Sequence, residues 1–329
     1  MKKNISYIIA ATLMVGSLFA CSSKYTAAEK SADSLQIVTT IFPEYDWVKQ
    51  ILGDNPADAQ VTMLLDNGVD LHSYQPTAED ILKISTCDLF IYVGGESDEW
   101  VEDALQEAIN KDMVVIDLLD VLGDNVKEEE LVEGMQGEEE EEYEEGEEEE
   151  TEYDEHVWLS LRNASILCDR IADALALVDA EHADVYESNV TVYKDKLSAL
   201  DTKYENAVSD GSANTLLFGD RFPFRYLVDD YGLDYFAAFV GCSAETEASF
   251  ETIIFLAQKV NELSLPCVMT IEGTDHKIAE TIVQNTETKD QKILTMDSMQ
   301  STTARDVQNG ATYLSLMENN LEVLKEALQ

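Results

Sequence analysis

Basic residues are scarce in this chain. Over 329 residues, 21 Lys and Arg stand against 67 Asp and Glu, which gives a formal net charge of −46 at pH 7. Because such a field repels phosphate backbones, we expect no nucleic-acid binding. A strongly negative surface favours cationic solutes instead.

Cysteine and histidine are also rare, with five and four residues respectively. No two cysteines form a Cys-x-x-Cys pair, which removes the usual zinc-finger pattern. Four cysteines lie in apolar or half-apolar surroundings, where buried free thiols and disulfides both remain open: Cys87, Cys168, Cys242 and Cys267. Because histidines are so few, each one in a structured context is informative: His72, His156, His182 and His276.

Common catalytic fingerprints are missing as well. The sequence contains no P-loop, no nucleophile elbow and no Gly-x-Gly-x-x-Gly motif, so it offers no standard cue for nucleotide binding or acyl transfer. After the first 20 residues, no apolar run is long enough to span a bilayer.

The N-terminus has the pattern of a secretory signal peptide over residues 1–20. Two lysines precede an apolar stretch, and a small residue, Ala20, comes directly before Cys21. This arrangement resembles a bacterial lipobox, which implies a lipid on Cys21 and a protein anchored at the extracytoplasmic face of the cell membrane. Residues 21–33 are small and polar, as expected for a flexible tether.

An acidic run occupies residues 128–155, with 18 acidic side chains in 28 positions and no Lys or Arg. Blocks of like charge are usually solvated and self-repelling, so we predict a disordered loop. The run ends at His156, and an imidazole behind clustered carboxylates is a candidate ligand for a divalent cation.

The remainder alternates buried strand patterns with helical ones, which predicts parallel βαβ units. The sequence therefore predicts an α/β protein with two open lobes, each a mostly parallel sheet flanked by helices, joined by a long α-helix. The predicted N-terminal lobe covers residues 34–162, the linking helices 163–210 and the C-terminal lobe 211–329. Open sheets bind ligands beyond the carboxyl ends of their strands, so two facing lobes would make a cleft.

Several motifs occur in a fixed order along the mature chain. They are the lipobox, GVDLHSYQPTAED at 68–80, DEHVWLSL at 154–161, YLVDDYGL at 226–233, and MDSM at 296–299 followed by GATYLSLMENNL at 310–321. Together they resemble the metal-binding solute receptors of bacterial ABC importers, the zinc and manganese lipoproteins. The resemblance implies a monomeric, non-enzymatic receptor that carries Zn²⁺, or alternatively Mn²⁺, to an ABC transporter permease.

The resemblance also implies the metal ligands. His72 and His156 match the two ligands of the N-terminal lobe, and Asp297 matches a carboxylate of the C-terminal lobe. Neutral imidazoles with a carboxylate suit Zn²⁺ or Mn²⁺.

The third ligand position departs from the family, which has His or Glu where this chain has Arg221. Arginine stays protonated and cannot bind a metal. Asp220 or Glu272 would then complete a set of two imidazoles and two carboxylates, closer to the manganese type. Arg221 would otherwise form an ion pair with Asp297 or elsewhere, or bind an anion.

Two other functions stay open at this level. Arg221 and Arg225 suit a receptor for an anionic or metal-chelate solute. A metallohydrolase would need a general base, for which Glu155 beside His156 is the one candidate.

Overall fold

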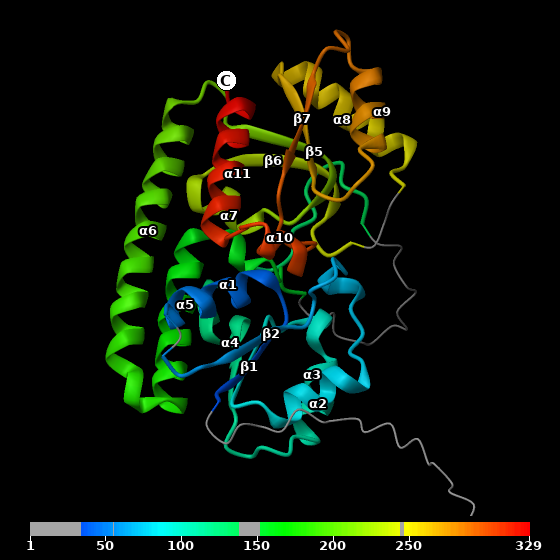
Figure 1. The fold of residues 1–329 in the computed structure, drawn as a ribbon. Helices are drawn as coiled ribbons and strands as arrows, with labels where there is room; N and C mark the ends of the chain where they lie inside the picture. Colours follow the sequence, from blue (N-terminus) through cyan, green and yellow to red (C-terminus); the bar gives the residue numbers. More distant parts are fainter. Residues whose placement is uncertain (1–33, 55, 138–151, 244–246) are drawn as a thin grey trace, which may run out of the picture. The chain divides into compact units, whose positions relative to one another are not determined.

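The computed structural model describes residues 34–54, 56–137, 152–243 and 247–329 (Figure 1). The predicted signal peptide, Cys21 and the predicted tether lie outside these residues. The described part from Ser34 to Gln329 forms one compact unit. Within it, no helix combines the length and the apolar character needed to cross a membrane. Of its cysteines, Cys168, Cys242 and Cys267 are free thiols, and Cys87 is buried.

The N-terminal lobe is built on a four-stranded sheet in which all neighbours are parallel. The spatial order is β2-β1-β3-β4. Its strands are β1 (Gln36–Thr39), β2 (Gln60–Met63), β3 (Leu89–Tyr92) and β4 (Val114–Asp117). The helices that connect or follow them are α1 (Phe42–Leu52), α2 (Ala78–Thr86), α3 (Trp100–Gln106) and α4 (Leu118–Leu122).

The C-terminal lobe repeats this topology with the order β6-β5-β7-β8, again all parallel. The strands are β5 (Thr215–Phe222), β6 (Asp234–Val240), β7 (Cys267–Ile271) and β8 (Lys292–Met296). The helices are α7 (Arg225–Tyr231), α8 (Phe250–Leu263), α9 (Lys277–Asn285), α10 (Ala304–Gln308) and α11 (Tyr313–Ala327). The predicted fold class is confirmed. The two sheets have the same strand order, although the sequence shows no repeat between the two halves.

Strand β5 is longer than its sequence pattern predicts. Thr215 and the three apolar residues after it predict a strand over 215–218, but the structure continues it to Phe222 with a register shift between Phe218 and Arg221. Gly219 makes this possible, because a Cβ there would come within 2.7 Å of the Ala279 Cα on α9. Asp220 and Arg221 therefore lie on the strand and not in a loop after it.

Two helices, α5 (Leu161–Val178) and α6 (Ala183–Asp210), link the lobes. Helix α6 has 28 residues and packs against α1 from the N-terminal lobe and against α7 and α11 from the C-terminal lobe (Figure 1). Helix α11 in turn reaches α1, where the rings of Tyr313 and Trp47 lie 5.2 Å apart. The lobes thus share one continuous apolar core.

The short helical turn η4 (Val157–Leu159) ties the two lobes together from inside this core. The Trp158 indole, fully buried, donates to the backbone oxygen of Ser298 at 2.8 Å. The Tyr313 hydroxyl donates to the backbone oxygen of Trp158 at 2.6 Å. These bonds fix the backbone that directly follows His156.

The acidic run is only partly as predicted. Its two ends are ordered: the backbone of Glu129 donates to Glu152 at 3.0 Å, and Asp154 donates to Lys127 at 2.9 Å. Gln136 adds a bridge to strand β6 at Phe239. Backbone pairing and contact with the C-terminal sheet override charge repulsion at these ends. Residues 138–151 lie outside the described part of the chain.

Replacing Tyr313 by Phe is expected to destabilise the protein by about 1–3 kcal/mol, because it leaves the buried Trp158 carbonyl without its donor. The measurement is chemical denaturation followed by far-ultraviolet circular dichroism. Tyr153→Phe, at a side chain that is 50% exposed, serves as the control and should change stability little. Equal stability of the Tyr313 variant and the wild type would contradict the assigned bond.

Candidate metal centre

His72 lies beyond the carboxyl end of β2, on the short turn η1 (Leu71–Ser73). Asp70 caps this turn, with its carboxylate accepting the His72 backbone N–H at 3.1 Å. The cap orients the imidazole, which is half-buried. A side-chain cap of this kind satisfies a backbone donor that has no partner within the turn.

His156 is fully buried at the end of the acidic run. Asp154 holds it twice, because its Oδ1 accepts from the His156 backbone N–H at 2.9 Å and lies 3.0 Å from the ring Nδ1. The imidazole also packs against the Trp158 ring, with centroids 5.3 Å apart. Its orientation is therefore set by a carboxylate on one edge and an aromatic wall beside it.

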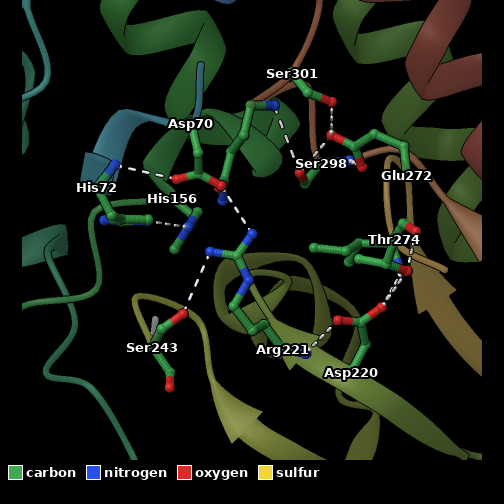
Figure 2. Close-up of polar contacts among 12 residues, drawn as sticks. Asp70, His72, His156, Asp220, Arg221, Ser243, Glu272, Thr274, Ser298 and Ser301 are labelled. Atoms are coloured by element: carbon green, nitrogen blue, oxygen red, sulfur yellow. Dashed lines mark hydrogen bonds and ion pairs between the residues drawn. The ribbon is translucent and has the colours of Figure 1, made fainter. Parts of the chain in front are cut away.

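The two imidazoles face each other through their outer nitrogens. The Nε2 atoms of His72 and His156 lie 3.2 Å apart (Figure 2). On the opposite edge, the His72 Nδ1 lies 2.8 Å from the Ser97 hydroxyl and 3.4 Å from a Glu155 carboxylate oxygen. Both rings thus have Nδ1 beside a carboxylate and Nε2 directed at a common point, which is the usual arrangement around metal-binding histidines.

The electrostatics follow from these contacts. Burial works against a charged His156, but Asp154, Glu155 and Glu129 together outweigh it, so the pKa of His156 lies above its ordinary value. Burial raises the pKa of Glu155, but hydrogen bonding and attraction from His72 outweigh it and leave that pKa lowered. Burial raises the pKa of Asp70, but Arg221 and His72 together outweigh it and leave that pKa lowered. The centre is a compact set of charges that compensate one another.

A third donor, Cys242, comes from the loop after β6. Its Sγ and one ring nitrogen from each of His72 and His156 lie within 4.8 Å of one another. No other cluster of three or more such donors occurs in the described ranges. The sequence does not mark Cys242 as a ligand, and its one signal is its place directly after a buried strand, beside Gly241.

The guanidinium of Arg221 is held by hydrogen bonds and an ion pair within the protein. Its Nη2 forms an ion pair with Asp70 at 2.8 Å, and its Nη1 donates to the backbone oxygen of Ser243 at 3.4 Å (Figure 2). Gln300 satisfies its neighbours when its amide is turned so that the nitrogen donates to the same Asp70 carboxylate at 2.8 Å. Its amide oxygen then accepts from the His156 Nε2 at 2.5 Å. Asp70 thereby joins the His72 turn to two segments of the C-terminal lobe.

The three carboxylates expected as ligands lie outside this cluster. Asp220 accepts from the Thr274 hydroxyl at 2.9 Å and from a backbone N–H of Ile271. Glu272 accepts from the backbone and the hydroxyl of Ser298 at 2.7 and 2.8 Å (Figure 2). Their hydrogen bonds are internal to the C-terminal lobe.

Asp297 and Glu272 both line a cavity of about 520 Å³ to which neither His72 nor His156 contributes. Its carboxylate accepts from the backbone N–H of Met299 at 2.8 Å. Burial, reinforced by the Glu272 charge, raises the pKa of Asp297 to about 7. Of the three ligands expected from the resemblance, His72 and His156 lie together in the structure, and Asp297 is not part of their cluster.

Arg225 is occupied as well. Its guanidinium pairs with Glu130 at 3.1 Å and lies 3.8 Å from Asp229 on the same helix. Neither of the arginines considered for anion binding therefore lacks a carboxylate partner.

Comparison with known proteins decides the family. The family model described as zinc-uptake complex component A, periplasmic, matches residues 37–327. The chain belongs to this zinc-uptake family. The resemblance inferred from the ordered motifs is thereby confirmed.

Individual relatives agree. The chain is 32% identical to the zinc-binding lipoprotein AdcA of Streptococcus pneumoniae, over 98% of this chain and 61% of that protein. It is 29% identical to the high-affinity zinc uptake system protein ZnuA of Bacillus subtilis, over 98% and 96%. The chain thus spans about three-fifths of the first relative and nearly all of the second.

Solved structures share the two-lobe fold. The Zn(II)-bound ZnuA-like domain of S. pneumoniae AdcA superposes with a TM-score of 0.68 at 28% identity, covering 90% of this chain and 99% of that domain. The metal-dependent lipoprotein YcdH of B. subtilis gives a TM-score of 0.72 at 25% identity, covering 90% and 100%.

A double-mutant cycle tests the bond between the lobes at the centre. Asp70→Asn keeps an acceptor for the His72 N–H, and Arg221→Gln removes the positive charge. We expect a coupling energy of about 1 kcal/mol in unfolding, because the two side chains are only 23% and 19% exposed.

The matched control is the cycle Lys203→Gln with Glu318→Gln, an ion pair whose two side chains are both 57% exposed. Water and salt screen that pair, so its coupling should be smaller. Equal coupling energies in the two cycles would contradict a structural role for the Asp70–Arg221 pair.

Proposed function

We propose that this protein is an extracytoplasmic receptor that binds Zn²⁺ between His72 and His156 and delivers it to the permease of an ABC importer. The observation that carries the proposal is the convergence of two Nε2 atoms at 3.2 Å, each ring backed by a carboxylate. The names of the relatives, which are zinc-binding or zinc-uptake proteins, support the same cargo.

The spacing fits a zinc ion. Two nitrogens at 2.0–2.1 Å from a tetrahedral zinc lie about 3.3 Å apart, close to the distance between the two rings. The ion would enter between the Nε2 atoms and replace the contact of the His156 Nε2 with the Gln300 amide oxygen, while both Nδ1 atoms keep their partners. Little reorganisation of the imidazoles is then needed, because Asp154 and Glu155 already orient them.

Asp297, Asp220 and Glu272 are not carried into the proposed ligand set. Each carboxylate accepts hydrogen bonds within the C-terminal lobe, and none belongs to the cluster around the histidines. The manganese-type set of two imidazoles and two carboxylates therefore receives no support from their positions.

Catalysis is not part of the proposal. Glu155, the candidate general base, accepts the Ser97 backbone N–H at 2.9 Å and lies against His72. In this position it orients a ligand, and it is not aimed at a substrate. An anion receptor is disfavoured too, because Arg221 and Arg225 are both paired with carboxylates.

The cellular setting follows from the N-terminus and the relatives. We propose that a lipid on Cys21 anchors a monomeric receptor to the outer face of the membrane and that residues 21–33 act as the tether. The description of one relative as a lipoprotein supports the anchor.

Replacing both His72 and His156 by Ala is expected to abolish tight zinc binding, lowering affinity by more than about 100-fold because both imidazole donors are lost. Metal content by mass spectrometry and isothermal titration with Zn²⁺ provide the measurement, with about one ion per wild-type chain expected. The control replaces the other two histidines, His182 and His276, and should bind normally. Unchanged zinc content in the first variant would contradict the proposed site.

Deleting residues 138–150 is expected to leave high-affinity zinc binding intact. Solvated carboxylates bind divalent ions weakly and without much selectivity, so this segment can only raise the local cation concentration. Titration at physiological ionic strength should give a dissociation constant close to that of the wild type. A large loss of affinity would place ligands within the deleted segment.

A further inference from the structure

The family's third ligand position lies on β5, and this chain has Arg221 there. In the sheet, Arg221 pairs with Phe239 on the neighbouring strand β6. Cys242 follows three residues later, in the loop at the carboxyl end of that strand. Neighbouring parallel strands end at the same edge of a sheet, so a donor after β6 reaches the region that a donor on β5 would reach.

The loop that carries Cys242 touches the His156 ring directly. A Cβ on Gly241 would lie 2.9 Å from the Cε1 and 3.0 Å from the Nδ1 of His156, closer than side-chain carbons approach. Glycine is therefore required for this approach. It brings the next residue, Cys242, alongside both imidazoles.

The position of the loop is fixed from two sides. Glu129 accepts the backbone N–H of Cys242 at 3.0 Å, and Arg221 donates to the backbone oxygen of Ser243. The same Arg221 binds Asp70, which caps the turn of His72. Arg221 thus acts as a positioning residue that holds two donor-bearing segments against each other.

We propose that Cys242 is the third zinc ligand, so that the ion is held by two imidazoles and one thiolate and the lost ligand of β5 is replaced from β6. This inference rests on the proposed function, because it concerns the same ion. It is carried by the common placement of the three donor atoms within 4.8 Å.

The geometry needs only a small adjustment. With Zn–N near 2.0–2.1 Å and Zn–S near 2.3 Å, tetrahedral ligand atoms lie about 3.6 Å apart. The three donor atoms lie within 4.8 Å of one another, so the sulfur would move closer to the two nitrogens as the ion binds. As the sulfur–zinc bond forms, the thiol proton is released to water, since only the thiolate binds.

A thiolate also changes which metal is preferred. Sulfur is a soft donor that favours Zn²⁺ and Cd²⁺, whereas Mn²⁺ favours oxygen donors. A set of two nitrogens and one sulfur therefore selects zinc over manganese more strongly than the imidazole and carboxylate set expected from the sequence.

The test uses Co²⁺ in place of Zn²⁺ on the full chain kept under reducing conditions, together with zinc titrations. Cobalt bound to a thiolate has a sulfur-to-metal charge-transfer band in the near ultraviolet, which nitrogen and oxygen ligands do not produce. We expect this band in the wild type and in the control Cys267→Ser, where the replaced thiol lies in strand β7. We expect its loss in Cys242→Ser, with zinc affinity lowered at least about 10-fold.

Cys242→Asp adds a readout of selectivity. Exchanging sulfur for oxygen should raise the affinity for Mn²⁺ relative to Zn²⁺, whereas a cysteine outside the metal shell would leave the ratio unchanged. Binding of one Co²⁺ per wild-type chain without the band would overturn the role of Cys242 and leave the histidine site standing. Failure of the wild type to bind zinc or cobalt would instead overturn the proposed function itself.

Discussion

The centre depends on one constraint, the complete burial of the His156 imidazole. A buried imidazole needs a partner for each ring nitrogen, and Asp154 supplies one at 3.0 Å. The other nitrogen, Nε2, faces the Gln300 amide oxygen and the imidazole of His72, whose own Nδ1 is held by Ser97 and Glu155. Trp158, two residues after His156, is locked between the lobes by its bonds to Ser298 and Tyr313. The same packing that stabilises the fold therefore orients the two donors.

The strand order shared by the two sheets places the candidate metal centre where open α/β sheets usually bind ligands. In each sheet the second strand in sequence, β2 or β6, lies at the edge, and the first, β1 or β5, lies next to it in the interior. The strand order therefore reverses beside β1 and beside β5, and open α/β sheets bind ligands at such a point. His72 comes after β2, Arg221 lies near the end of β5 and Cys242 follows β6. Asp70 joins these segments through Arg221 and Gln300. The apolar core that α1, α6 and α11 share holds the two lobes together at this junction.

Much of this could be predicted from the sequence. Apolar strand patterns that alternate with amphipathic helical patterns correctly predicted the two parallel sheets. The ordered motifs correctly predicted the family, and they pointed to His72 and His156 as metal ligands. The ends of the acidic run were mispredicted, because composition does not reveal the backbone bonds between Lys127–Glu129 and 152–154. The extension of β5 was missed because Asp220 and Arg221 look like loop residues until Thr274 and Asp70 are seen beside them. Cys242 was missed because strand pairing, not sequence spacing, brings it to the histidines.

We propose that the zinc ion lies between the two Nε2 atoms at the junction of the lobes. A crystal structure of the zinc-loaded protein, with anomalous diffraction recorded on both sides of the zinc absorption edge, tests it most directly. We expect one strong anomalous peak within bonding distance of the Nε2 atoms of His72 and His156, with the Cys242 sulfur beside it. A peak in the cavity of Glu272 and Asp297, with none between the histidines, would contradict it.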